Sequence, residues 1–243
     1  MRHRARLRAG WLTLVILALA PLGSVRRVPR TLTSVASSGS VARPLSRRAR
    51  ATEALRATVR RRLAEGGTGT YIGEMLTERD SALARWPDRR GAALTIWIQP
   101  RVTLADWSDD DRTAVRDAFL EWGALDLPIH FAFVADSAEA DVHVTFVSRF
   151  AEPISGRTHW TRDERWWITD ADVVLALHHQ SGASLDVDAM HAMALHEIGH
   201  LLGLDHTDDA TSIMAPTVRV RGLSSADRAT VRLLYTLPPG GVR

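Results

Sequence analysis

The stretch HEIGHLLGLDH, from His196 to His206, combines three histidines, a glutamate and two glycines. Residues 196–202 of this stretch form the end of a helix predicted over residues 187–202, and Gly203 ends that helix. Residues four apart on a helix share one face, so His196 and His200 can direct imidazole nitrogens at a single point. Gly203 can adopt a positive φ and turn the chain sharply, which would return His206 to that point.

This arrangement predicts a metal site with catalytic chemistry. Neutral imidazole is a good zinc ligand, and three protein ligands leave a fourth position open for water, as in catalytic zinc sites. Glu197 can then act as general base towards that water and as general acid towards the leaving group. A buried helix whose histidines merely bond carbonyl groups is the alternative, and the rarity of the full spacing by chance disfavours it. We therefore expect one catalytic Zn²⁺ bound by His196, His200 and His206.

The elongated motif is identified as that of the metzincin zinc endopeptidases. Thr207 follows the third histidine, which is closer to matrixins, the matrix-metalloproteinase group, than to other metzincins. Residues 211–216, TSIMAP, resemble the Met-turn, with Met214 forming a floor under the metal and Pro216 as in matrixins. The resemblance covers about residues 90–237. It implies an exported zinc-dependent endopeptidase that hydrolyses peptide bonds through a zinc-bound water activated by a glutamate base.

The chain also departs from the matrixin pattern. It has no cysteine, so the cysteine switch of matrixins is excluded. A second, structural metal is not expected, because there is no His-x-Asp segment and the ligand set cannot be filled in a recognisable order from His159, His178 and His179.

Substrate binding is expected to follow the family as well. The resemblance implies that a peptide pairs in extended form with an exposed edge strand, expected here at residues 170–177. Pro216 and Val218 are expected to line the substrate pocket, and Val218 stands where a tyrosine is common in matrixins.

Hydrophobic periodicity predicts an α+β fold, and the resemblance makes it a metzincin-type zincin domain: a twisted mixed sheet with an active-site helix, a Met-turn and a C-terminal helix. Strands are expected over residues 92–100, 129–136, 141–147 and 168–177. Helices are expected over residues 51–65, 71–86, 108–125, 187–202 and 224–235. Ser108 and Asp111 form a capping-box pattern at the start of one of them.

The N-terminal part of the chain has a different composition. Residues 1–25 join an arginine-rich start to a short apolar run, which predicts a signal peptide or an uncleaved signal anchor. Residues 26–65 are basic and are expected to be a largely disordered linker or pro-segment. Residues 66–243 are expected to form the protease domain. These features predict a secreted, periplasmic or cell-envelope protein.

Charge is divided unevenly along the chain. Residues 1–65 contain 15 arginines and two acidic residues, whereas residues 66–243 contain 16 arginines and 26 acidic residues. The basic excess is therefore N-terminal, and no nucleic-acid partner is expected. We expect a protein or peptide substrate, membrane contact only through an N-terminal anchor, and a monomer. Two alternatives stay open: a non-peptidase hydrolase of amide bonds in cell-wall or small substrates, and a metal-stabilised binding module, against which Glu197 argues.

Overall fold

The structure is a computed structural model that describes residues 47–78, 82–89, 91–238 and 240–241. The signal peptide or anchor expected over residues 1–25 lies outside these residues, as does much of the linker expected over 26–65. The domain boundaries therefore stay predictions. Among the described helices, none has the length and apolar character needed to cross a membrane.

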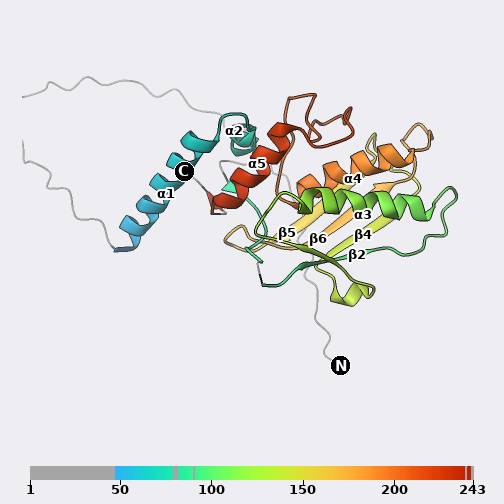
Figure 1. Cartoon of the computed structure of the whole chain (residues 1–243), viewed down its shortest axis with the longest axis horizontal. Helices are drawn as coiled ribbons and strands as arrows, with labels where there is room; N and C mark the ends of the chain where they lie inside the picture. The colour runs from blue at the N-terminus through green and yellow to red at the C-terminus, as the bar shows by residue number, and fades with distance from the viewer. Residues whose placement is uncertain (1–46, 79–81, 90, 239, 242–243) are drawn as a thin grey trace, which may run out of the picture. The chain divides into compact units, whose positions relative to one another are not determined.

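A five-stranded sheet organises the domain, with the strand order β3-β2-β4-β6-β5 (Figure 1). The neighbouring pairs β3-β2, β2-β4 and β4-β6 are parallel, whereas β5 runs antiparallel to β6. This mixed sheet confirms the α+β prediction. The strands are β2 (Leu94–Ile98), β3 (Phe131–Phe133), β4 (Val142–Val147), β5 (Gly156–Arg162) and β6 (Ile168–Ala176).

Two features of the sheet differ from what the sequence predicts: the presence of β5 and the position of β6. The sequence does not predict β5, because its residues GRTHWTR are mostly polar and show no apolar alternation. An edge strand can keep such side chains, since it is paired on one side only. The prediction that residues 170–177 form the exposed edge is wrong, because β6 lies between β4 and β5. The edge strand that packs against α4 (Val187–Leu201), the helix that carries His196 and His200, is β5.

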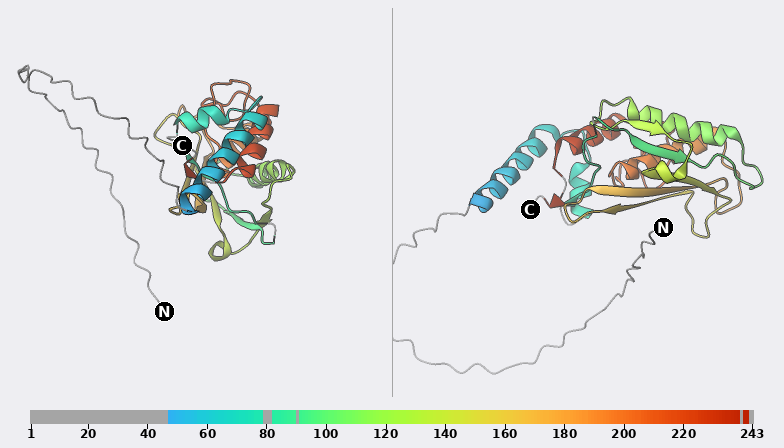
Figure 2. Two further views of the ribbon diagram at one scale, coloured as in Figure 1. Left: turned by 90° about the vertical axis from the view of Figure 1, so that its left-hand side faces the viewer. Right: turned by 90° about the horizontal axis from the view of Figure 1, so that it is seen from below.

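Helices α3 (Asp109–Gly123) and α4 (Val187–Leu201) pack against each other on one face of the sheet (Figures 1 and 2). The capping box predicted at Ser108 and Asp111 is present and starts α3. Asp186 caps α4 by accepting a hydrogen bond from a backbone N–H of its first turn. Both helices therefore begin where their sequences provide a capping side chain.

Apolar side chains fill the space between the helices and the sheet. The indole Nε1 of Trp122 on α3 donates to the carbonyl of Leu195 on α4 at 3.0 Å, so this buried donor is satisfied. The core holds α4 in a fixed position over β6 and β5, which matters because α4 carries most of the site. Buried core residues include Leu94, Ile96, Val115, Phe119, Trp122, Val142, Val144, Leu195 and Ile198.

Three further α-helices and a short 3-10 helix at Ser137–Glu139 belong to the described fold. The helices predicted over 51–65 and 224–235 form as α1 (Arg47–Gly66) and α5 (Ser225–Thr236). The helix predicted over 71–86 is wrong beyond its start, because α2 (Ile72–Glu78) ends early. The chain then extends as β1 (Ala82–Leu83), which pairs with β7 (Gly240–Gly241). Residues 82–86 are all buried, which suits an extended internal segment better than a helix with a polar face.

Candidate metal centre

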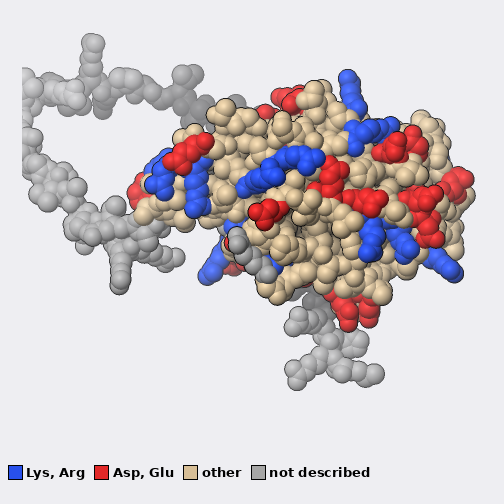
Figure 3. Space-filling model, in the orientation of Figure 1, with Lys and Arg blue, Asp and Glu red and all other residues tan. Residues whose placement is uncertain are grey.

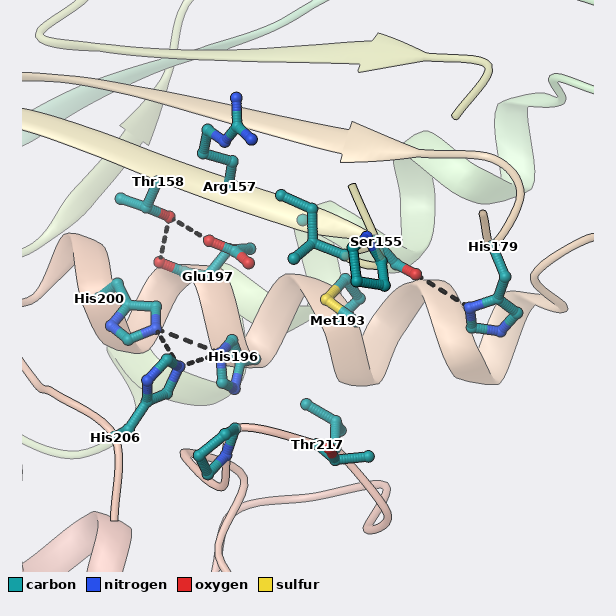
Figure 4. A pocket seen from close by; sticks show the side chains of 15 residues that line it. Ser155, Arg157, Thr158, His179, Met193, His196, Glu197, His200, His206 and Thr217 are labelled. Atoms are coloured by element: carbon teal, nitrogen blue, oxygen red, sulfur yellow. Dashed lines mark hydrogen bonds between the residues drawn. The ribbon is translucent and has the colours of Figure 1, made fainter. Parts of the chain in front are cut away.

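The three histidines of the motif meet at one point beside α4 (Figure 4). The Nε2 atom of His200 is 3.2 Å from that of His196 and 3.2 Å from that of His206, and the remaining pair is 3.3 Å apart. A tetrahedral ion with Zn–N bonds of 2.0–2.1 Å would hold its nitrogen ligands about 3.3–3.4 Å apart. The observed triangle therefore fits one zinc ion that binds all three rings.

Backbone carbonyls orient two of these rings. The Nδ1 atom of His196 is 2.7 Å from the Ile213 oxygen, and that of His200 is 3.1 Å from the Leu204 oxygen. A carbonyl oxygen only accepts, so each Nδ1 carries the hydrogen and each Nε2 turns a lone pair to the shared point. Burial lowers the pKa of His196 to about 4, so its ring is neutral near pH 7. Neutral, pre-oriented rings are what a metal ligand set requires.

The turn after α4 depends on Gly203. Its φ is +99°, a conformation that residues with a side chain rarely adopt. A Cβ atom here would also collide with the carbonyl oxygen of Ala84 and would lie 3.4 Å from Leu234 Cδ2. Both the backbone angle and the surrounding space therefore require glycine. The turn separates His200 from His206 and brings their rings together again.

Met214 lies under the helix in a fully buried position. It packs against α4 where Gly199 leaves room for its sulfur. The backbone around it supports two ligands: the Ile213 carbonyl accepts from His196, and the Met214 carbonyl accepts from the N–H of Thr207, next to His206, at 3.2 Å. The structure thus places Met214 where the expected Met-turn would support the metal site.

A buried carboxylate anchors this turn to α5, and the sequence analysis does not assign it that role. Asp227 accepts hydrogen bonds from the hydroxyl of Ser212, from the N–H of Ile213 at 3.1 Å and from the N–H of Ser224 at 2.7 Å. The Tyr71 hydroxyl also donates to it, at 3.2 Å, and burial raises the pKa of this phenol. The capping-box spacing of Ser224 and Asp227 is legible in the sequence, whereas the bonds to the turn are not.

Glu197 and the three histidines line one cavity of about 380 Å³. The glutamate is buried, with 4% of its surface exposed. Its Oε2 atom is 2.6 Å from Thr158 Oγ1 on β5. Burial raises the pKa of Glu197 to about 7, although the hydrogen bond from Thr158 and the charge of Arg157 oppose the shift. Burial therefore favours the protonated form of this carboxyl group in the metal-free protein.

Other residues complete the wall of this cavity. Pro216 and Val218, predicted to line the substrate pocket, both lie in it. Ser155 and His179 also line it, and the Ser155 Oγ atom is 2.9 Å from His179 Nδ1. Sequence reasoning singles out neither Ser155 nor Thr158, because both belong to the polar segment around β5 that has no recognisable pattern.

The histidines considered for a second metal, His159, His178 and His179, do not belong to this ligand group, although His159 lines a cavity with His200. His178 contacts Asp106 and the carbonyl of Ser148, both at 3.2 Å, and His179 contacts Ser155. Among the described residues, the His196, His200 and His206 group has the geometry of a metal site. The expectation of a single metal stays a prediction.

Comparison with known proteins agrees with this geometry. Residues 148–236 match the family model described as matrixin. The chain is 32% identical over 149 residues to Metalloendoproteinase 1-MMP of Arabidopsis thaliana, covering 53% of this chain and 38% of that protein. It is 29% identical over 150 residues to Matrix metalloproteinase-C of Caenorhabditis elegans, covering 52% and 24% of the two chains.

A third relative, Metalloendoproteinase 1 of Glycine max, is 29% identical over 168 residues, covering 60% of this chain and 51% of that protein. The chain thus spans between 24% and 51% of the length of these three relatives. The segment that the family model matches contains the complete histidine motif, Met214 and the whole of strands β5 and β6. Residues 148–236 are therefore similar to a matrixin domain, and this segment includes the three histidines that could hold a metal ion.

Proposed function

We propose that this chain is an exported zinc-dependent endopeptidase that hydrolyses internal bonds of proteins or peptides. One observation carries the proposal: three Nε2 atoms within 3.3 Å of one another share a cavity with a buried glutamate. A site with only structural zinc would have no need for an ionisable carboxyl group beside the ligands. The names of the matrixin relatives, which include metalloendoproteinases, support the same activity.

The residues divide the chemistry among them. A bound Zn²⁺ supplies Lewis acidity, which lowers the pKa of water and polarises a carbonyl group. His196, His200 and His206 would hold the ion, and Glu197 would take a proton from the attacking water and pass it to the leaving amine. The substrate lies extended along β5, the last strand in the order of the described sheet, and pairs with its backbone.

The decisive test is metal-dependent cleavage by the purified secreted form. We expect it to cut unfolded casein and members of a peptide library, to lose this activity with 1,10-phenanthroline, and to regain it with one equivalent of zinc. Mass spectrometry of the products reports internal cleavage, and elemental analysis reports the zinc content. Turnover of muropeptides without cleavage of proteins would instead favour the cell-wall amide hydrolase, and bound zinc without any turnover would favour the binding module.

A second cavity suggests one substrate preference. It measures about 200 Å³ and shares His179, Met193 and Val218 with the catalytic cavity. Arg219 and Arg221 line it as well. Because these guanidinium groups are exposed to solvent, each is expected to contribute about 1 kcal/mol or less to binding an acidic side chain.

We therefore expect peptides with Asp or Glu at the position that enters this cavity to be cleaved faster than peptides with Gln there. The expected advantage is at most about fivefold in kcat/KM per arginine, the factor given by 1 kcal/mol. Arg219→Gln and Arg221→Gln should reduce it, while Arg112→Gln, which changes a residue lining a different cavity, should not. Equal cleavage of the acidic and amide peptides by the unaltered protein would refute this preference.

The other parts of the proposal rest on the sequence. Export depends on residues 1–25, and N-terminal sequencing of the secreted form tests whether that segment is removed. The absence of a nucleic-acid partner and a monomeric state remain part of the proposal. Figure 3 supports the first of these, because arginine and acidic side chains are interspersed on the face that it shows.

A further inference from the structure

Thr158 on β5 directs its hydroxyl group at Glu197 (Figure 4). Its Oγ1 atom lies 2.6 Å from the carboxylate Oε2 of Glu197 and 2.9 Å from the carbonyl oxygen of the same residue. One hydroxyl therefore contacts both the side chain and the backbone of the glutamate. These contacts join the edge strand to α4 at the residue that the proposed mechanism uses as its base.

A second residue of β5, Gly156, also packs closely against the Glu197 side chain. Gly156 lies two positions before Thr158 and so points to the same face of the strand. A Cβ atom at Gly156 would lie 2.6 Å from Glu197 Cγ and 2.8 Å from its Cδ, closer than such atoms approach in proteins. The glycine leaves room for the carboxyl group, and the threonine supplies a polar contact to it.

We propose that Thr158 is a positioning residue that fixes the Glu197 carboxyl group beside the metal centre. The inference rests on the proposed function, because it gives Glu197 the role of general base. A glutamate side chain has several rotatable bonds, so one end must be held if it is to occupy a single position. The short contact to Oε2 provides that hold, and Thr158 itself neither takes nor gives a proton in the overall reaction.

The hydroxyl suits both forms of the glutamate, because it has one hydrogen and two acceptors within reach. While Glu197 is ionised, Thr158 donates to Oε2. After Glu197 takes a proton from water on its other carboxyl oxygen, Oε1, Thr158 can continue to donate to Oε2, which still has lone pairs. When the proton passes to the leaving amine, the first arrangement returns. The carboxyl group thus keeps a hydrogen bond throughout the cycle.

The test compares Thr158→Val, which keeps the shape of the side chain without its hydroxyl, with Thr158→Ser, which keeps the hydroxyl. We expect Thr158→Val to lower kcat about 10- to 100-fold, the loss typical of a misplaced catalytic group, with KM nearly unchanged. Thr158→Ser should recover most of that loss. Thr161→Val is the matched control, because Thr161 is exposed on the same strand and contacts Thr169 instead.

Crystal structures of the zinc-loaded variants provide a readout that does not depend on turnover. The Glu197 carboxyl group should leave its position in Thr158→Val and keep it in Thr158→Ser, while zinc content and thermal unfolding stay unchanged in both. An unchanged kcat in Thr158→Val, or an equal loss in Thr158→Ser, would overturn the inference. If the unaltered protein cleaves no substrate, the proposed function fails, and an unmoved Glu197 in Thr158→Val would separately exclude the positioning role.

Discussion

Glu197→Gln is expected to bind one zinc ion and to lose nearly all peptide hydrolysis, with kcat/KM reduced about 10²- to 10⁴-fold. Glutamine has the shape of glutamate and can still accept the hydrogen bond from Thr158 through its amide oxygen. It cannot take a proton from water. The three histidines are untouched, so the metal should remain. Initial rates on casein and on a fluorogenic peptide, together with elemental analysis, measure both effects.

The same substitution should also change stability in the metal-free protein. Burial raises the pKa of Glu197 from its usual 4.5 to about 7, so the folded state binds the proton more tightly than the unfolded state. The free energy of unfolding should therefore fall as pH rises from about 4.5 to about 7, and Glu197→Gln should lessen this fall. Glu164→Gln, which changes an exposed carboxylate, is the control. Normal casein cleavage by Glu197→Gln would contradict the mechanism.

Gly203→Ala is expected to destabilise the fold by about 2–5 kcal/mol and to weaken zinc binding severely. The positive φ strains any residue with a Cβ atom, and that atom would meet the carbonyl oxygen of Ala84. Relief of the collision requires the turn to move, and His206 moves with it. Thermal unfolding of the metal-free protein measures the first effect, and competition with a chromogenic chelator measures the second.

The matched control is Gly222→Ala. Gly222 lies in the segment that follows Met214. A Cβ atom there would meet nothing within 4 Å, and its φ is not positive. This variant should unfold and bind zinc as the unaltered protein does. If Gly203→Ala kept both its stability and its zinc affinity, the turn would not be what places the third ligand.

The histidine site is predictable from sequence because its determinants are local. Two ligands follow from the helical repeat, and the third follows from a glycine that ends the helix. The start of α3 is predictable for a similar reason, since Ser108 and Asp111 interact within one turn. These patterns can be recognised without knowing which distant segment of the chain packs beside them.

The missed features depend on tertiary contacts. The polar segment from Gly156 to Arg162 becomes a strand because β6 pairs with it, and nothing in its own composition indicates this. The contact of Thr158 with Glu197 arises only because that strand lies against α4, so the sequence alone does not reveal it. Residues 82–86 have a helical sequence pattern but are not helical in the structure. Burial on all sides outweighs their local helix propensity.

The anchoring of the Met-turn by Asp227 has a consequence for protein synthesis. A ribosome translates the histidine motif before it reaches α5, so a nascent chain can contain every metal ligand while its turn is still unanchored. Translation products that stop short of residue 227 would carry the motif without the support that orients His196. The turn that orients His196 is therefore expected to gain its full support only after α5 has emerged and docked.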